Sequence, residues 1–378
     1  MISDLNRQAS IVGVGATPQG KVPGRSGDDL AIWALREALS DAGIAAQDLD
    51  GLIVQHSFGG NGELGVVGHR LGIEPHVAYN VAYQGQALQI AVMAVAAGVC
   101  RHVALMYGTN QRSNRNVFGM TSFHIGGNFE TVYGLANPGS TAAFNYRRRM
   151  HDFGATEEQL GAVAIAQSKA AALNPLAVYR DLITPETYLK APYVIAPLRL
   201  VDFSMVSDGG FAMIISDSER ASDLHKAPVT IEAMSYQSNF RELEDPQAMY
   251  HPSQVPNAER LWSSCDYGPS DMRALYVQDA YTPNVLSALE NYGFCEFGTA
   301  HEWIQGGRIE LGGELPVNPN GGQNRMTYMV GWHNTYDAVH QLRGTADSPE
   351  RQLADCNLVL STMSLGHWQN TCSIILGK

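Results

Sequence analysis

The segment Tyr79–Gly98 combines a buried strand end, a short turn and an apolar helix that opens near Gly85. The first N–H groups of a helix have no partner within the helix, and the helix dipole makes them a binding site for negative charge. The N–H groups near Tyr83–Gly85 could therefore stabilise an oxyanion. Ala82 in the turn has no nucleophilic group.

Two histidines in expected loops are candidates for proton transfer or for substrate contact. His124 lies in the Gly/Asn-rich stretch 119–140, and His367 follows the run Ser361–Gly366 near the end of the chain. An imidazole titrates near neutral pH, so either side chain could move a proton. A lone loop histidine is more often a surface residue, and both interpretations stay open.

Length and composition restrict the possible classes of protein. The chain has 378 residues, 45% of them hydrophobic, which is enough for one large domain or two fused halves. No run of about 18 apolar residues occurs, so we expect no membrane span. The net charge of −12 makes nucleic acid a poor partner.

The N-terminal stretch and the cysteines favour a reduced, cytoplasmic setting. Residues 1–15 lack a basic region followed by a long apolar stretch, so no secretory signal is expected. The five cysteines have neither metal-site nor disulfide-framework spacing. Arg147, Arg148 and Arg149 are either a solvated helix end or a cradle for the phosphates of a nucleotide-tailed substrate such as coenzyme A.

Alternating strand and helix patterns predict a layered α/β fold. In the first part we expect a helix over 28–42, capped by Asp28 or Asp29 and ended by Gly43, and strands at 9–14, 51–55, 102–107 and 211–216. Residues 108–196 interrupt this order with helices at 142–153 and 157–173, the second of which ends at Asn174-Pro175. This excursion is predicted to be an inserted loop domain that covers a site.

The second part of the chain repeats the first. Gly321-Gly322 precedes a predicted helix over 327–342, as Gly85 precedes its own helix, and the other expected elements are strands at 229–233, 274–278, 358–361 and 372–376 and a helix at 284–292. We therefore predict two similar α/β halves, 1–225 and 226–378, with the loop domain at about 108–196 inserted in the first.

Several segments together resemble the thiolase superfamily, in particular the branch of sterol-carrier-protein-x thiolases and steroid side-chain aldolases. The resemblance covers nearly the whole chain and rests on five segments in the right order: Ile11–Gly15, Arg149–Arg180, Ser207–Gly210, Asp279–Gly293 and Asn318–Gly322. It implies the thiolase fold, with two α/β halves in a layered α-β-α-β-α arrangement.

The reactive residues of thiolases are replaced in this chain. The resemblance lays the family's Cys-x-Ser-Gly on Ala82, Gln84 and Gly85, and puts Gln278 in the place of a His or Asn that helps to form an oxyanion hole. It puts Tyr328 where thiolases carry the activating His. The C-terminal loop 361–367 lacks the family's Cys. These changes argue against Claisen thiolysis.

Steroid side-chain aldolases share the missing Cys and the Tyr at the His position, so the resemblance implies retro-aldol cleavage of a β-hydroxyacyl-CoA. The implied substrate is a steroid with a 17-hydroxy side chain carried as a CoA thioester, and the products are a 17-ketosteroid and propionyl-CoA. No cofactor is expected, because CoA belongs to the substrate. The related actinobacterial aldolases place Tyr where Gln278 stands, which is a departure in this chain.

The resemblance also suggests a role for each candidate residue. Tyr328 would transfer the proton, Gln278 would stabilise the enolate, and Asp279 would support the site from behind. Tyr281 is either a core aromatic or a second phenol. The expected substrate-contacting positions are Tyr83, Gly85, Gly321, Gly322, His367 and His124.

The expected partners follow from the same resemblance. Family members act with a small OB-fold protein that carries a zinc ribbon, so any zinc would lie in that partner. They also form homodimers through the strand that leads into the nucleophile helix, here around His76–Ala82. Two alternatives stay open, namely a non-catalytic scaffold subunit and a non-thiolytic acyl transferase.

Overall fold

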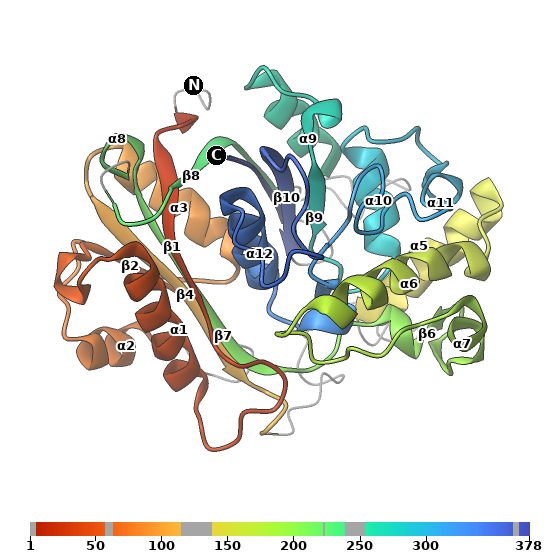
Figure 1. Ribbon diagram of the computed structural model, residues 1–378, viewed down its shortest axis with the longest axis horizontal. Helices are drawn as coiled ribbons and strands as arrows, with labels where there is room; N and C mark the ends of the chain where they lie inside the picture. Colours follow the sequence, from red (N-terminus) through yellow and green to blue (C-terminus); the bar gives the residue numbers. More distant parts are fainter. Residues whose placement is uncertain (1–4, 57–62, 115–137, 222–223, 239–253, 366–369) are drawn as a thin grey trace.

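The computed structural model describes residues 5–56, 63–114, 138–221, 224–238, 254–365 and 370–378. Its centre is a nine-stranded mixed sheet in the order β3-β2-β4-β7-β1-β8-β11-β10-β9. Figure 1 shows the early strands on one side of the molecule and the late strands, in teal and blue, on the other. The two groups meet where β1 pairs with β8, through Ser10 opposite Thr230 and Ile11 opposite Val229.

The first group of strands and its helices come from the N-terminal part of the chain. Parallel pairing joins β2 to both β3 and β4, whereas β7 runs antiparallel to β4 and β1. The elements are β1 (Ala9–Ala16), α1 (Gly27–Ala42), β2 (Gly51–Gln55), α2 (Leu64–Leu71), β3 (Val77–Val81), α3 (Gln84–Ala96), β4 (His102–Asn110), β7 (Asp208–Asp217) and α8 (Ser218–Ala221).

The second group repeats the strand order of the first. Val317 bridges Leu275 in parallel, outside β9, and takes the place that β3 has in the first group. The elements are β8 (Val229–Ser238), α9 (Gln254–Ser263), β9 (Ala274–Val277), α10 (Pro283–Asn291), α11 (Ala300–Trp303), α12 (Trp332–Arg343), β10 (Leu358–Leu365) and β11 (Asn370–Gly377). When the strands of each group are numbered in chain order, with Val317 counted as the third strand of the second group, both groups have the order 3-2-4-5-1 across the sheet. The boundary between residues 225 and 226 stays a prediction.

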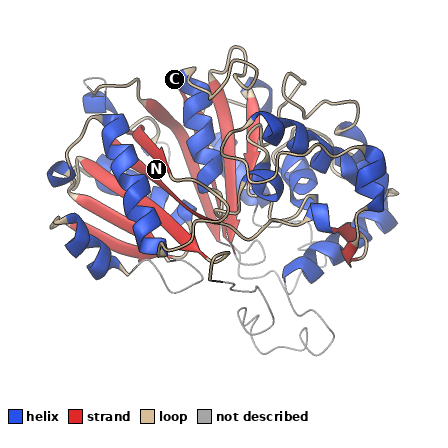
Figure 2. Cartoon of the chain, turned by 60° about the horizontal axis from the view of Figure 1, so that its bottom comes forward, coloured by secondary structure: helices blue, strands red, loops and turns tan. Residues whose placement is uncertain are grey.

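Side chains on alternate faces of the strands divide the core into layers. Leu105 and Tyr107 of β4 pack in a central cluster with residues of α3 and α12, whereas Ala104 and Met106 pack against α1. On β9, Tyr276 faces the central cluster and Leu275 faces α10. Helices α3 and α12 therefore lie between the two groups of strands, and the expected α-β-α-β-α layering is confirmed. Figure 2 shows helices on both sides of the strands.

Between β4 and β7 the chain forms a helical excursion at one end of the molecule (Figure 1). It contains α5 (Pro138–Phe153), α6 (Glu157–Leu173), α7 (Pro185–Lys190), β5 (Tyr193–Ile195) and β6 (Leu198–Arg199). The structure confirms the two expected helices, and Asn174 ends the second. That this excursion covers a site stays a prediction.

Two expected helix boundaries were wrong. Helix α1 is capped by Ser26 rather than by Asp28 or Asp29: Ser26 Oγ accepts the N–H of Asp29, and the Asp29 carboxylate accepts the N–H of Ser26. Helix α12 begins at Trp332, not near Thr327. Gly321, Gly322 and Gly331 have φ values of +106°, +63° and +91°, which a continuous helix cannot accommodate. A π-helical turn, Gly322–Met326, and a loop occupy the interval.

Close packing of α3 on β11 explains Gly85. A Cβ at this position would lie 2.5 Å from the Cβ of Cys372 and 2.7 Å from the ring of Tyr83. The Cβ of Cys372 cannot move without shifting the backbone of β11.

We therefore expect Gly85→Ala to lower the free energy of unfolding by about 1–3 kcal/mol, because overpacking forces side chains and backbone apart. Gly65→Ala is the matched control: Gly65 lies in α2 with no atom within 4 Å of an added Cβ. Alanine there should be neutral or stabilising by up to about 1 kcal/mol. Urea unfolding measures both, and equal effects would contradict the packing argument.

Candidate active site

The candidate active site lies where three segments meet: the start of α3, the turn that follows β9, and the glycine-rich segment before α12. Figure 1 shows α12 beside β9 and β10 in the middle of the molecule. A Cβ added to Gly331, the cap of α12, would lie 3.1 Å from Gln84 Oε1 and 3.8 Å from Gln278 Oε1. The side chains of Gln84 and Gln278 thus approach the same residue from opposite halves of the chain.

The start of α3 carries Ala82 and Tyr83. Ala82 is exposed, and its N–H donates to Oε1 of Gln86 over 3.0 Å. Tyr83 is 1% exposed and packs against Tyr236, with ring centroids 6.3 Å apart. Burial, reinforced by Cys372 and Tyr236, raises the pKa of the Tyr83 phenol. Tyr83 is therefore a packed core residue, and contact of its hydroxyl with a substrate stays a prediction.

Gln84 connects the two central helices. Its side chain is fully buried, and Nε2 donates to Thr335 Oγ1 of α12 over 2.9 Å. Gln84 stands where the resemblance expects a small Ser. The longer amide can reach across to α12, which sequence reasoning did not foresee.

The side-chain oxygen of Gln278 is held by a backbone hydrogen bond. Its Oε1 accepts the N–H of Ser364 over 3.1 Å, and its own N–H donates to the carbonyl of Thr362 over 3.1 Å. The bond to Oε1 fixes the orientation of the amide, so Nε2 is directed away from Ser364 as a donor. Only Nε2 of this amide can donate to an oxyanion, because the amide oxygen is an acceptor.

Asp279 lies beneath the Gly321-Gly322 turn. The carboxylate is fully buried and accepts bonds from the N–H of Gln323 (3.0 Å) and from Nε2 of Gln167 on α6 (2.5 Å). A Cβ on Gly322 would lie 2.2 Å from this carboxylate, which explains the glycine. Burial raises the pKa of Asp279 to about 7 despite these donors. The carboxylate connects the two site segments to α6, while its part in catalysis stays a prediction.

Tyr328 and Tyr281 lie close enough for their phenols to interact. Burial raises the pKa of Tyr328 to about 12. Burial, and secondly the neighbouring Tyr328, raises the pKa of Tyr281, whose ring packs edge-on against Phe203 at 5.2 Å. Burial, and secondly Tyr328, also raises the pKa of Tyr107 on β4, whose ring stacks on Trp332. The resting state of Tyr328 is therefore a neutral phenol, which donates rather than accepts a proton.

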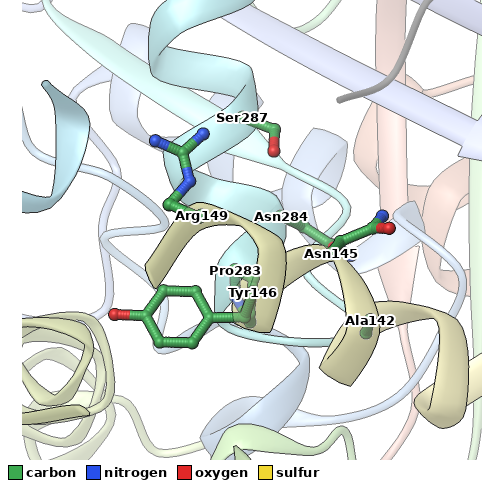
Figure 3. A pocket seen from close by; sticks show the side chains of 7 residues that line it. All are labelled: Ala142, Asn145, Tyr146, Arg149, Pro283, Asn284 and Ser287. Atoms are coloured by element: carbon green, nitrogen blue, oxygen red, sulfur yellow. The ribbon is translucent and has the colours of Figure 1, made fainter. Parts of the chain in front are cut away.

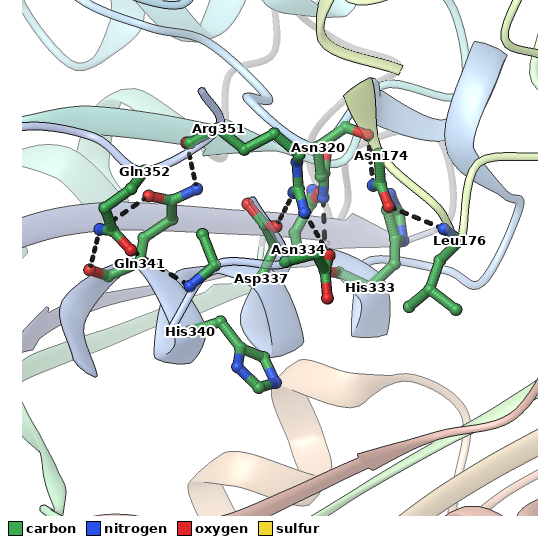
Figure 4. A network of polar contacts seen from close by, with 12 residues as sticks. Asn174, Leu176, Asn320, His333, Asn334, Asp337, His340, Gln341, Arg351 and Gln352 are labelled. Atoms are coloured by element: carbon green, nitrogen blue, oxygen red, sulfur yellow. Dashed lines mark hydrogen bonds and ion pairs between the residues drawn. The ribbon is translucent and has the colours of Figure 1, made fainter. Parts of the chain in front are cut away.

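A buried polar network fixes the start of α12 (Figure 4). Asn320 Nδ2 donates to Oδ1 of Asn334, and the carbonyl of Asn320 accepts from Asn174 Nδ2 over 2.8 Å. Further along α12, Asp337 accepts from Tyr276 over 2.8 Å and forms an ion pair with Arg351. Because these groups are buried and paired, the helix cannot slide without leaving several of them unsatisfied.

Arg149, the last residue of the arginine cluster Arg147–Arg149, is neither part of a solvated helix end nor part of a cradle for phosphates. This side chain is 2% exposed and makes a two-pronged ion pair with Glu290 of α10, at 2.6 and 2.7 Å. It therefore fastens α5 to α10 and cannot also hold a phosphate. Figure 3 shows the small pocket between these helices, lined by Ala142, Asn145, Tyr146, Arg149, Pro283, Asn284 and Ser287.

Some expectations lie outside what the structure describes or remain untested by it. His124 and His367 fall outside the described residues. Within the described residues, no group of three or more His, Cys, Asp and Glu side chains could hold a metal. The helices of the described part are all too short or too polar to cross a membrane.

Comparison with solved structures defines the class of the fold. The chain superposes on human mitochondrial 3-ketoacyl-CoA thiolase in complex with CoA with a TM-score of 0.73 at 17% identity, covering 98% of each chain. The family model for a thiolase C-terminal domain-like region matches residues 244–378. The fold is therefore that of the thiolases.

Closer relatives narrow the family. The chain is 35% identical to a 17-hydroxy-3-oxo-4-pregnene-20-carboxyl-CoA lyase of Mycobacterium tuberculosis (99% of this chain, 100% of the relative). It is 34% identical to a steroid side-chain-cleaving aldolase of Thermomonospora curvata (100% and 99%). The solved Ltp2-ChsH2(DUF35) aldolase superposes with a TM-score of 0.89 at 34% identity, covering 99% and 98% of the two chains. The chain belongs to the steroid side-chain-cleaving aldolases of the thiolase superfamily.

The contacts of Asp279 generate a prediction about stability. In Asp279→Asn, the new amide offers one acceptor to two donors, and Gln167 cannot simply turn because its Oε1 accepts from Asn324 over 3.0 Å. We expect a loss of about 1–3 kcal/mol in the free energy of unfolding, the usual cost of an unsatisfied buried donor. Asp266→Asn, at an exposed position, is the control. Indistinguishable urea midpoints for the two variants would refute the supporting role.

Proposed function

We propose that the protein is a carbon–carbon lyase that cleaves a β-hydroxyacyl-CoA by a retro-aldol reaction. The substrate that we propose is a 17-hydroxy steroid whose side chain is a CoA thioester, cleaved to a 17-ketosteroid and propionyl-CoA. The activities for which two relatives of 34–35% identity over the full chain are named support this assignment.

The observation that carries the proposal is that two replacements occur together: Ala82 stands in the place of the thiolase Cys, and Tyr328 in the place of the activating His. Thiolysis requires a thiol that can be acylated, and Ala82 has none. Retro-aldol cleavage requires only that the β-hydroxyl lose its proton, that the Cα–Cβ bond break, and that the resulting enolate be stabilised and protonated at Cα. The half-buried phenol of Tyr328 can protonate the enolate, and the amide of Gln278 can stabilise it.

Each residue then has a defined task. The Nε2 group of Gln278 donates to the thioester oxygen, on which charge develops as the bond breaks, and the first-turn N–H groups of α3 add to this stabilisation. Tyr328 delivers the proton to Cα, because its pKa of about 12 keeps it protonated at neutral pH. Tyr281 lies beside Tyr328 and is our candidate for contact with the β-hydroxyl: it accepts the proton that the hydroxyl loses and passes its own to Tyr328 as Tyr328 protonates Cα, so that both phenols end neutral.

The assembly and location that we propose follow the same relatives. Strand β3 is the edge of the sheet, and Ala78, Tyr79 and Asn80 are exposed along it, which supports a homodimer through this edge. The match to the Ltp2-ChsH2(DUF35) aldolase supports a second subunit, for which we propose an OB-fold protein with a zinc ribbon. No further cofactor is needed. All five cysteines are free, in keeping with a cytoplasmic location.

The proposal predicts the products and the residues that control them. Incubation of the protein and its partner with the steroid thioester should release propionyl-CoA, detected by mass spectrometry. Gln278→Ala should lower kcat by about 100- to 1,000-fold, the usual effect of losing one oxyanion donor. Tyr328→Phe should lower it at least as much. Tyr193→Phe removes a phenol that is bonded to Glu157 at the surface and should have no effect. Full activity of Tyr328→Phe would favour a scaffold subunit instead.

The raised pKa of Tyr328 predicts the alkaline limb of the pH profile. A group that donates while protonated is fully active below its pKa, so a pKa of about 12 leaves kcat flat between pH 7 and 10. If Tyr328 had to ionise and act as a base, kcat would rise about tenfold per pH unit over this range. Stopped-flow or steady-state release of acyl-CoA distinguishes the two.

A further inference from the structure

Tyr328 belongs to the C-terminal half of the chain, yet residues of the N-terminal half hold the segment that carries it. Val178 and Tyr179 donate their N–H groups to the carbonyls of Met326 and Arg325 over 2.9 and 3.0 Å. Beyond these bonds the chain leaves the π-helical turn, and Thr327 is extended, with φ −172° and ψ 149°. Helix α12 starts only at Trp332, so no helical hydrogen bonds fix Tyr328.

Ser207 makes the first of two contacts to this segment. Its side chain is fully buried, and Oγ accepts the N–H of Tyr328 over 3.3 Å. The next residue is itself fixed, because buried Asp208 accepts the N–H of Val22 and the hydroxyl of Ser113 over 2.8 and 2.5 Å. Ser207 therefore directly precedes β7, whose first residue, Asp208, is held in place by these bonds.

Gln19 makes the second contact. Its Oε1 accepts the hydroxyl of buried Thr327 over 3.0 Å, and its Nε2 donates to the carbonyl of Thr17 over 2.8 Å. The amide lies directly over Gly209, where an added Cβ would be 2.2 Å from Oε1. Glycine at this position thus provides the space in which Gln19 reaches Thr327.

We infer that Ser207 and Gln19 form a clamp that positions the Tyr328 phenol for proton transfer. The clamp fixes the side chain of Thr327 and the backbone of Tyr328, two consecutive points on an otherwise extended segment. The phenol on this segment lies near those of Tyr281 and Tyr107 and adds to the raised pKa of each. Ser207 and Gln19 are positioning residues, since they act through Tyr328 and not on the substrate.

The kinetic consequence rests on the proposed role of Tyr328. Thr327→Val removes the hydroxyl at nearly constant shape, and Ser207→Ala removes the acceptor. Both should lower kcat by about 10- to 100-fold, the scale of a slightly misplaced catalytic group, with KM changed less than about twofold. Thr327→Ser keeps the hydroxyl and should restore the rate. Ser10→Ala breaks a comparable buried hydroxyl pair, with Ser218 at 2.8 Å, and should leave kcat unchanged.

A second measurement does not depend on catalysis. In the full-length chain labelled with 13C at tyrosine Cζ, the Tyr328 resonance is assigned by its loss in Tyr328→Phe. It should shift or broaden in Ser207→Ala and Thr327→Val and stay in place in Thr327→Ser and Ser10→Ala. An unmoved resonance in both clamp variants overturns the clamp. Full activity of Tyr328→Phe overturns the proposed function, while the resonance still decides the clamp.

Discussion

The buried carboxylate of Asp279 is the point on which the arrangement of the site depends. It accepts from Gln323 in the glycine-rich segment and from Gln167 of α6, while its own backbone continues directly from Gln278. One group therefore sets the separation between Gln278, our proposed oxyanion donor, and the segment that leads to Tyr328. The interior cannot tolerate either donor unpaired, so the three segments must fold together.

Hydrogen bonds also join the two pseudo-symmetric halves of the chain. Each half supplies a central helix, and Gln84 of α3 reaches Thr335 of α12 where their first turns approach each other. The segment of the second half that carries Tyr328 is bonded to side chains of the first. A site shared in this way requires that the strand order of both halves be complete before its geometry exists, which ties activity to correct docking of the whole nine-stranded sheet.

Much of the fold could be predicted from the sequence because its signals are local. Periodic apolar residues, followed by a glycine for α1 and α10 and by Asn174-Pro175 for α6, marked these helices to within a residue or two. The start of α12 was missed because the positive φ at Gly331 and Val330 depends on how the segment packs. Valine rarely adopts a positive φ, so Val330 does not indicate a break in the helix. At the site, the positions of Gln278 and Tyr328 followed from the family pattern. The contacts of Gln84, Ser207 and Gln19 join residues up to 308 apart in the chain, a distance that spacing in the sequence cannot register.

Ala82 also has a consequence for chemical durability. An enzyme that relies on an exposed thiolate is open to peroxides and alkylating electrophiles, because the thiolate is the reactive form of cysteine. Here the exposed position carries a methyl group, and burial raises the pKa of each of the five cysteines, which favours the thiol over the reactive thiolate. Without the nucleophilic thiol, the enzyme is less open to inactivation by oxidants and thiol-directed inhibitors.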